Sequence, residues 1–206
     1  MKPADNKIYL ASKSPRRREL LRQIGVEFEL LLLRDQAPRG PEVSEEVLPD
    51  ETAENYVARV TREKAEHAAR IMLMRRLPMR PVLTADTTVA IDGRILGKPA
   101  DFKEAMDMLR ALSGRTHQVL TSVALSNEDG IEQITQTSEV TISPLTESMM
   151  RAYCTSAEPY DKAGGYGIQG LAAVFVASIT GSYTGIMGLP LHETANLLRQ
   201  AGIATL

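Results

Sequence analysis

The stretch Val82-Leu83-Thr84-Ala85-Asp86-Thr87-Thr88-Val89-Ala90-Ile91 consists mainly of β-branched and small apolar residues. This composition predicts a β-strand, whose side chains alternate between two faces. The alternation places Asp86 on one face and its neighbour Thr87 on the other. The following Asp92-Gly93 is typical of a type I′ hairpin turn and leads into Arg94-Ile95-Leu96. We therefore expect a strand that closes into a hairpin and carries an aspartate in its middle.

Strand and helix patterns alternate on both sides of this strand. Residues 8–11 predict a short buried strand, and Ser14 with Pro15 predicts the start of a helix that Gly25 ends. The other expected elements are a strand at 26–33, a loop or flap at 34–51, helices at 52–76, 101–114, 147–153 and 190–200, a hairpin of 119–125 with 131–142, and a strand at 172–179. Because helices and hairpins are interleaved, the sequence predicts an α/β fold with a mixed sheet.

The composition excludes several classes of protein. A net charge of −2 and 43% hydrophobic residues exclude a disordered acidic tail, a collagen-like repeat and a strongly basic nucleic-acid binder. Three Phe, six Tyr and no Trp argue against a base-stacking surface, and the single Cys154 rules out an intrachain disulfide and a multi-cysteine zinc site. The polar N-terminus and the lack of an apolar run of ~20 residues predict a soluble, cytoplasmic protein without membrane or nucleic-acid partners.

Two charged residues occupy positions where apolar residues are expected. Asp86 interrupts the strand at 82–91, and a carboxylate on a half-buried face needs a cation, a metal or a chemical role. Lys64 falls within the apolar stripe of the helix at 52–76, where a lysine either extends to solvent or reaches into a site. A structural ion pair remains the alternative for Asp86. Lys98, between Gly97 and Pro99, has the pattern of an ordinary exposed lysine.

Three successive arginines, Arg16-Arg17-Arg18, stand in the first turn of a predicted helix. The helix dipole disfavours cations at this end, so their presence indicates a negative ligand nearby. A strand, a serine-rich loop and a helix N-terminus also form a suitable geometry for phosphate. The alternative is a solvated basic patch or a nucleic-acid segment, and the net charge argues against the second.

The segment Glu158–Gly170 is rich in glycine. Residues 165–170 match G-x-G-x-x-G, but they follow a polar segment and precede an expected strand, so the context of a dinucleotide-binding fingerprint is missing. We predict a loop whose backbone closely approaches a ligand and which carries Asp161, Lys162 and Gln169. The amide of Gln169 can read a base edge because it both donates and accepts hydrogen bonds.

Together these motifs resemble the Maf family of nucleoside triphosphate pyrophosphatases over about residues 8–204. The matching segments are 10–17 with 19–21, 56–59 with 64–65, 85–87, 97–99, 112–114 with His117, 161–164, 166–170 and 188–191. The resemblance implies one Maf-like domain over residues 1–206. It also implies a two-lobed α/β fold of the Maf/ITPase-like kind, with a mixed β-sheet, flanking helices and a central cleft. The implied reaction is hydrolysis of a nucleoside triphosphate to the monophosphate and pyrophosphate.

The resemblance also assigns roles by motif position. Asp86 corresponds to the catalytic carboxylate, which accepts the proton of the attacking water. Glu45 corresponds to a flap glutamate that holds a divalent cation, Mg²⁺ or Mn²⁺, together with Asp86. Glu46 and Glu42 remain alternatives, because the segment 34–50 is longer and more charged than expected for the family.

The remaining assigned residues bind the substrate. Ser12, Arg16, Lys64 and Lys98 correspond to phosphate-handling positions, and Asp161 and Lys162 belong to the matching glycine-rich motif. Arg16, Thr87 and Gln169 resemble the subgroup that prefers dTTP and UTP; the subgroup that prefers 7-methyl-GTP more often has Gln after the catalytic Asp and Glu in the late position.

Three other functions stay open from the sequence. One is a pyrophosphatase that prefers 7-methyl-GTP. Another is a regulatory module that senses nucleotides or binds nucleic acid without turnover, because family members have been linked with septum formation and cell-division arrest. A third is a phosphatase that releases orthophosphate stepwise. The sequence also leaves a homodimer open.

Overall fold

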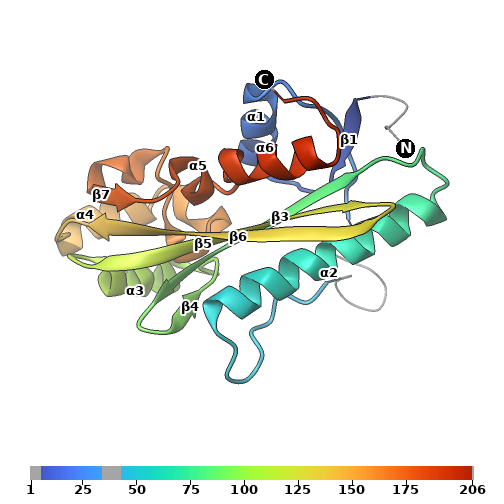
Figure 1. Ribbon diagram of the computed structural model, residues 1–206. Helices are drawn as coiled ribbons and strands as arrows, with labels where there is room; N and C mark the ends of the chain where they lie inside the picture. The colour runs from blue at the N-terminus through green and yellow to red at the C-terminus, as the bar shows by residue number, and fades with distance from the viewer. Residues whose placement is uncertain (1–5, 34–42, 206) are drawn as a thin grey trace.

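A mixed seven-stranded sheet organises the computed structural model, which describes residues 6–33 and 43–205 (Figure 1). The strand order is β2-β1-β3-β5-β6-β7, and β4 pairs with β3 beside this path. The strands are β1 (Lys7–Leu10), β2 (Glu27–Leu30), β3 (Val82–Ile91), β4 (Arg94–Leu96), β5 (Thr116–Asn127), β6 (Gly130–Ile142) and β7 (Val176–Thr180). The predicted α/β fold with a mixed sheet is therefore confirmed: β1 is parallel to β2 and β3, and the other pairings are antiparallel.

The expected strand at 82–91 is β3, with the predicted bounds. Asp92 (φ 50°) and Gly93 (φ 73°) are both left-handed, as the predicted type I′ turn requires. On the side of β3 away from β5, β1 pairs only with Val82 and Leu83, and β4 pairs only from Val89 onward. Among the described strands, none covers this edge at residues 84–88. The middle of β3, which contains Asp86, is thus left open between two partner strands.

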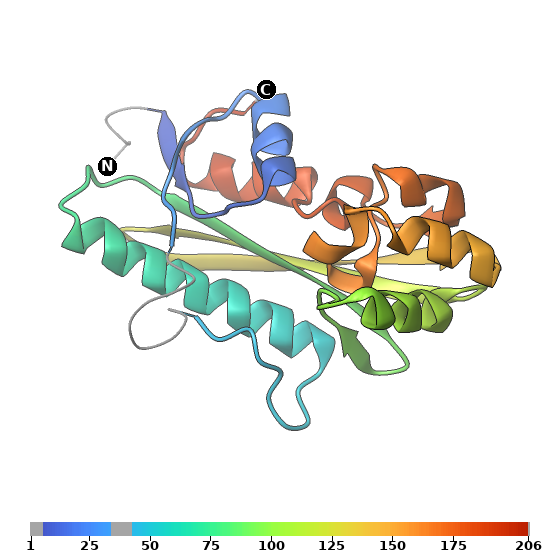
Figure 2. The ribbon, with the colours of Figure 1, turned by 180° about the vertical axis from the view of Figure 1, so that it is seen from behind.

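Helix α2 (Ala53–Met74) covers one face of the sheet, as Figure 2 shows from behind. The Thr52 hydroxyl caps its N-terminus by accepting a hydrogen bond from the amide of Asn55. The helix packs in two clusters, with Ala68 and Ile71 near Val82 and with Val57 and Val60 near Ala90 and Leu120. The predicted apolar stripe is confirmed, and Lys64 lies between its two ends.

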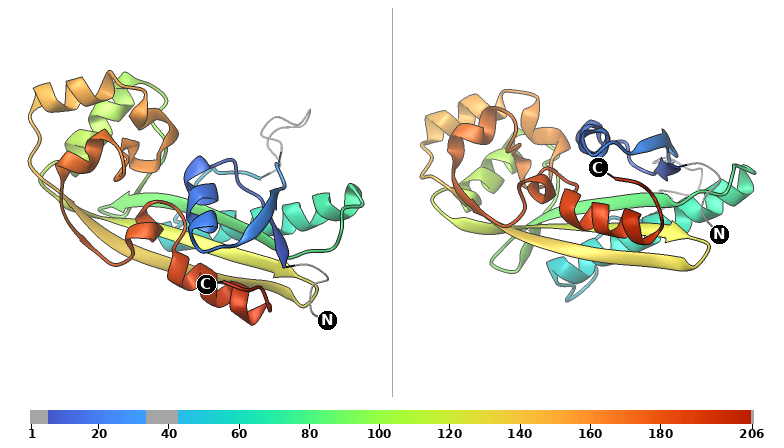
Figure 3. Two further views of the ribbon diagram at one scale, coloured as in Figure 1. Left: turned by 90° about the horizontal axis from the view of Figure 1, so that it is seen from above. Right: turned by 45° about the horizontal axis from the view of Figure 1, so that its top comes forward.

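Two groups of helices stand apart on the opposite face (Figure 3). The first group packs around Leu83 and Ala85, and the second packs around Val89 and Ile91 of the same strand. Thr87 lies between them on this face, at the boundary of the two groups. The first group contains α1 (Pro15–Gln23) and α6 (Leu191–Gln200); the second contains α3 (Phe102–Leu112), α4 (Glu147–Cys154) and three 3₁₀ turns, η1 (Glu158–Asp161), η2 (Ala163–Gly165) and η3 (Leu171–Phe175).

The structure corrects two predicted elements and adds one. The strand expected at 26–33 spans only Glu27–Leu30. The strand expected at 172–179 is wrong in its first half, because Leu171–Phe175 form a 3₁₀ turn that buries Ala172 and Phe175 at a spacing of three. A short helix, α5 (Tyr183–Ile186), was not predicted. Within the described ranges, no helix combines the length and apolar character needed to cross a membrane.

His117 of β5 is buried under the glycine-rich segment. His117 is 2% exposed. Its Nε2 lies 2.7 Å from the hydroxyl of Tyr166, whose ring packs edge-on against the imidazole. Burial lowers the pKa of His117 to about 4. The native state therefore holds this histidine neutral, while the unfolded chain protonates it below its ordinary value of about 6.5.

We expect acid to destabilise the protein through His117. As the pH falls from about 6.5 to about 4, the unfolded state gains a proton that the native state does not bind, which costs about 3 kcal/mol of unfolding free energy. Above pH 6.5 this contribution is constant. The check is urea unfolding of the wild type and of His117→Gln, which keeps a polar atom for Tyr166, across this range. A difference between the two proteins that does not change with pH would refute the assignment.

Candidate active site

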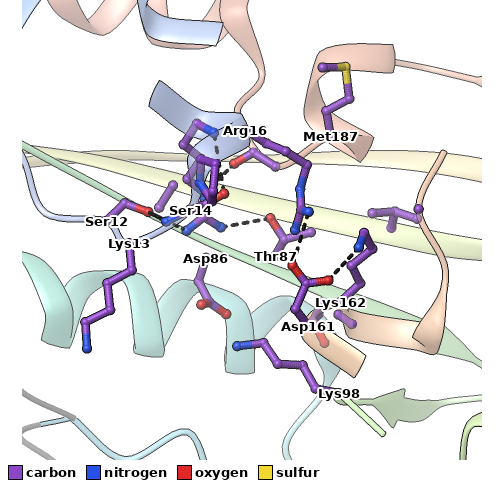
Figure 4. Close-up of a pocket in the computed structure, with 18 of the residues that line it drawn as sticks. Ser12, Lys13, Ser14, Arg16, Asp86, Thr87, Lys98, Asp161, Lys162 and Met187 are labelled. Atoms are coloured by element: carbon purple, nitrogen blue, oxygen red, sulfur yellow. Dashed lines mark hydrogen bonds and ion pairs between the residues drawn. The ribbon is translucent and has the colours of Figure 1, made fainter. Parts of the chain in front are cut away.

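A cleft of about 1070 Å³ lies between the two groups of helices. The open middle of β3 forms its floor, so Asp86 and Thr87 both reach it although they leave the strand on opposite faces. Figure 4 draws part of the lining of this cleft, with Asp86 and Thr87 among the labelled side chains. Every described residue that the sequence assigned to the site lines it: Ser12, Arg16, Glu45, Lys64, Asp86, Thr87, Lys98, Asp161, Lys162 and Gln169.

One lysine of the cleft pairs with two carboxylates at once. The Nζ atom of Lys64 lies 2.7 Å from Asp86 Oδ1 and 2.6 Å from Glu45 Oε1. The side chains of Lys64 and Asp86 are 17% and 14% exposed, whereas that of Glu45 is 53% exposed. Burial opposes the charge of Lys64, but the two carboxylates outweigh it and raise its pKa. Burial likewise opposes ionisation of Glu45, and Lys64 outweighs it and lowers its pKa.

Glu45 is held in place through its own backbone and through that of the next residue. The hydroxyl of Tyr56 donates to the Glu45 carbonyl at 3.0 Å, and Arg59 donates to the Glu46 carbonyl at 2.9 Å. Arg59 also binds both carboxylate oxygens of Glu51, at 2.7 and 2.9 Å. One turn of α2 therefore positions the segment that delivers Glu45. The Glu46 side chain is not needed for the carboxylate pair, and Glu42 lies outside the described residues.

The serine-rich loop after β1 presents a hydrogen-bond donor to the cleft. The Ser12 hydroxyl accepts hydrogen bonds from the amide of Ser14 (3.2 Å) and from Arg17 (3.3 Å). Among the described residues, none accepts its proton, so Ser12 can donate to an anionic ligand. Helix α1 begins immediately after, with Ser14 as its N-cap and without an acidic residue in its first turn.

The two arginines of α1 that line the cleft have different surroundings. Arg17 is bound within the fold: its guanidinium donates to the Gly188 carbonyl at 2.7 Å, to Ser12 at 3.3 Å and to Thr87 at 3.1 Å. Arg16 is oriented across the cleft, with one nitrogen 3.5 Å from Asp161 Oδ2 (Figure 4). Arg16 is the arginine that remains accessible to a ligand, while Arg17 ties the α1 loop to β3.

The hydroxyl of Thr87 has a fixed polarity. The neighbouring Thr121 hydroxyl donates to the Gly185 carbonyl at 2.8 Å, so it must accept from Thr87, 2.9 Å away. The proton of Thr87 is thereby committed, and Thr87 accepts from Arg17 on its other side. Toward a ligand, the Thr87 hydroxyl is therefore an acceptor only.

Two lysines approach the cleft from the second group of helices. Lys98 follows β4 and extends toward the side of the cleft occupied by Asp86 (Figure 4). Its ammonium makes no hydrogen bond with the described residues, although it contributes to lowering the pKa of Glu45. Lys162 donates to the Glu158 carbonyl at 2.7 Å and pairs with Asp161. Gln169 is exposed at the rim.

Sequence reasoning found the residues that enter the cleft and missed those that hold them. Arg17 was noticed only within the run of three arginines and a matching motif, Tyr56 only within a matching motif, and Thr121 was not singled out. The signal for Arg17 was weak, because three consecutive arginines do not reveal which one turns inward. Thr121 carried no signal, since a threonine on a strand is ordinary. The role of Arg17 becomes visible only through its contact with Thr87, 70 residues away in the chain. The role of Thr121 becomes visible only through its contact with Thr87, 34 residues away.

Sequence comparisons match this chain to one family model and to several named proteins. The family model described as Maf-like protein matches residues 7–201. A protein of Aromatoleum aromaticum named dTTP/UTP pyrophosphatase is 53% identical over 203 residues, covering 98% of this chain and 98% of the relative. Proteins of the same name from Dechloromonas aromatica and Ralstonia nicotianae are 50% and 55% identical, covering 97% and 95% of this chain and 100% and 94% of the relatives.

Among solved structures, the Staphylococcus aureus Ham1 protein matches with a TM-score of 0.43 and 17% identity, over 66% of this chain and 71% of that chain. The family model spans nearly the whole sequence, and the relatives match it end to end. The chain belongs to the family of Maf-like proteins.

Proposed function

We propose that this chain is a nucleoside triphosphate pyrophosphatase that hydrolyses dTTP and UTP to the monophosphate and pyrophosphate. The observation that carries the proposal is the pairing of Asp86 and Glu45 on the ammonium of Lys64, inside a cleft that also receives Arg16 and Lys98. A nucleoside triphosphate is an anion that carries a bound divalent cation. The carboxylates suit that cation, and the lysine and arginine side chains suit the phosphates. The relatives named dTTP/UTP pyrophosphatase support the choice of substrates.

Asp86 is suited to accept the proton of an attacking water. Its Oδ1 is bound by Lys64, while its Oδ2 accepts no hydrogen bond from the described residues. Lys64 orients the carboxylate through Oδ1, so the second oxygen is free to take a proton as the water attacks the α-phosphorus. The water oxygen forms its bond to phosphorus, the bond to the bridging oxygen breaks, and pyrophosphate leaves.

The carboxylates also fit a divalent cation, Mg²⁺ or Mn²⁺. Asp86 and Glu45 bring hard oxygen ligands within reach of a single cationic atom, as the position of Lys64 Nζ demonstrates. Such cations commonly use one or two carboxylates together with substrate phosphates and water. When bound, the cation supplies neutralisation of the triphosphate charge. The described residues contain no group of three or more His, Cys, Asp or Glu side chains that could hold it alone, so binding would depend on the nucleotide.

The cations on both sides of the cleft suit the triphosphate. Ser12 and Arg16 reach it from the α1 loop, and Lys98 and Lys162 reach it from the other group of helices. In the transition state, negative charge increases on the leaving pyrophosphate, and fixed cations stabilise it. Lys64 adds a cation that reaches the cleft from α2.

Two groups at the site suit a pyrimidine that carries a keto oxygen and an N–H. Thr87 offers only an acceptor, which matches the N3–H of thymine or uracil and mismatches the unprotonated N3 of cytosine. The Gln169 amide offers both a donor and an acceptor at the rim. With few aromatic residues in the chain, we expect hydrogen bonds to set the base preference.

A panel of triphosphates with product identification tests the function. With Mg²⁺ or Mn²⁺, we expect dTTP and UTP to yield one pyrophosphate and one monophosphate each, chelation to stop the reaction, and added cation to restore it. Binding without turnover would favour the nucleotide-sensing module. Stepwise release of orthophosphate would favour a phosphatase, and preferred hydrolysis of 7-methyl-GTP would favour the other subgroup. Each of these outcomes contradicts the proposal.

Replacing Asp86 tests the proton acceptor. We expect Asp86→Asn to lower kcat by about 10²–10⁴-fold, the usual range for loss of a general base, with a much smaller change in KM. Asp92→Asn is the matched control, because Asp92 ends the same strand but pairs with Arg115 at the surface, where its side chain is 63% exposed. A wild-type kcat in Asp86→Asn rules out Asp86 as the base.

Replacing Gln169 tests base recognition. Gln169→Glu removes the donor of the amide and adds a charge, so we expect the preference for dTTP and UTP over purine triphosphates to fall by about tenfold, the scale of one hydrogen bond. Gln118→Glu, on an exposed position of β5, adds the same charge away from the cleft. The measurement is the ratio of kcat/KM values for dTTP and dGTP. An unchanged ratio in Gln169→Glu excludes Gln169 as a specificity residue.

A further inference from the structure

We propose that Glu158 is a positioning residue that fixes the backbone on both sides of Gln169 and so sets the base preference of the site. The inference rests on the proposed role of Gln169 in reading the base. Glu158 begins the 3₁₀ turn η1 and precedes the glycine-rich segment that carries Gln169. The Gln169 amide makes no hydrogen bond with the described residues, so its direction depends on the backbone beneath it.

The carboxylate of Glu158 binds the chain immediately after this position. Its Oε2 accepts a hydrogen bond from the amide of Leu171 at 2.7 Å, and its Oε1 accepts from the amide of Ala172 at 3.2 Å. Both bonds are charge-assisted, and they start the turn η3 in place of the strand expected there. They fix the exit from the loop two residues after Gln169.

A relay through Tyr153 fixes the entry to the loop. The amide of Gly167 donates to the Tyr153 hydroxyl at 3.2 Å, and this hydroxyl donates to Glu158 Oε1 at 3.0 Å. Tyr153 is 4% exposed. Burial and then the Glu158 carboxylate raise its pKa, so the phenol keeps the proton that it donates. One carboxylate thus holds residue 167 on one side of Gln169 and residues 171 and 172 on the other.

The glycines of the loop allow this close approach. A Cβ atom at Gly170 would collide with the Glu158 carboxylate. A Cβ atom at Gly167 would lie 2.7 Å from Lys162 Cε and 3.2 Å from Glu158 Oε1. Gly167 and Gly170, two of the three glycines that resemble a dinucleotide fingerprint, therefore stand where the loop backbone packs against side chains of the chain itself; the third, Gly165, has a left-handed φ of 69°.

The side chain and the backbone of Glu158 act on different residues. Its carbonyl accepts the hydrogen bond of Lys162 at 2.7 Å, whereas its carboxylate accepts from Tyr153 and from the amides of Leu171 and Ala172. A substitution of the side chain thus spares the contact to Lys162. Since the carboxylate already accepts three hydrogen bonds from the chain, its part in the reaction is to position, and the groups that act on the phosphates are separate.

The first test compares Glu158→Gln, Tyr153→Phe, Gln169→Ala and the double variant Glu158→Gln with Gln169→Ala. Glutamine keeps the shape of the Glu158 side chain. Its NH₂ group is a donor, however, and it would face a backbone amide or the Tyr153 hydroxyl, which are donors themselves. We expect Glu158→Gln to raise KM for dTTP and lower the dTTP-to-dGTP ratio of kcat/KM, each by about tenfold, with kcat within about twofold. Tyr153→Phe, which leaves the carboxylate intact, should act in the same direction and more weakly.

In the Gln169→Ala background, Glu158→Gln should change the selectivity ratio by less than about twofold, because neighbouring residues that act as one unit are not additive. Glu147→Gln is the control: it lies on α4 like Tyr153, and its carboxylate binds Arg110 at the surface. An unchanged ratio in Glu158→Gln, a full additive effect in the double variant, or a drop in kcat as large as the rise in KM overturns the proposal.

A second measurement does not depend on turnover. Hydrogen exchange of the backbone amides of residues 167–172 should be at least about tenfold faster in Glu158→Gln than in the wild type and in Glu147→Gln. Unchanged exchange contradicts the anchoring role even if the kinetics change. Faster exchange together with an unaltered selectivity in Gln169→Ala supports the anchor and rejects the proposed reading of the base by Gln169, so the two failures are distinguishable.

Discussion

The site depends on a change of partner along one edge of β3. A strand that is paired along both edges presents its side chains to layers above and below it and keeps its backbone covered. Here β1 leaves β3 after Leu83 and β4 joins it at Val89. The residues between them face a cleft along the strand edge, so Asp86 and Thr87 serve one site from two faces. The two groups of helices diverge at the same point because each packs on one end of the strand.

Lys64 illustrates how a net charge near zero conceals a strongly polar site. Two carboxylates 2.6 and 2.7 Å from one ammonium form a compact cluster of charged groups. The ammonium of Lys64 lies between the two carboxylates and holds them close together at one point of the cleft. The remaining cations of the cleft are at its sides, where a triphosphate would extend.

The sequence predicted the elements more completely than the contacts. Local rules predict four features that the structure contains: the bounds of β3, its type I′ turn, the capped start of α1 and the apolar stripe of α2. The first half of the strand expected at 172–179 was wrong because its amides are taken by Glu158, a residue 13 positions earlier. The orientation of Arg17 and the polarity of Thr87 depend on partners far away in the chain, and no local pattern encodes them.

The proposed proton acceptor Asp86 and the proposed base-reading residue Gln169 lie on different parts of the molecule. Asp86 and Lys64 belong to β3 and α2, whose packing involves buried apolar residues along their whole length. Gln169 belongs to a loop whose position depends on a few hydrogen bonds to Glu158 and Tyr153. A change in the loop therefore shifts its backbone without disturbing the carboxylate pair. On the proposed assignments, a change in this loop can alter the part of the base preference that depends on Gln169 and leave Asp86 and Lys64 in place, because the loop and this pair line one cleft but do not share their supporting contacts.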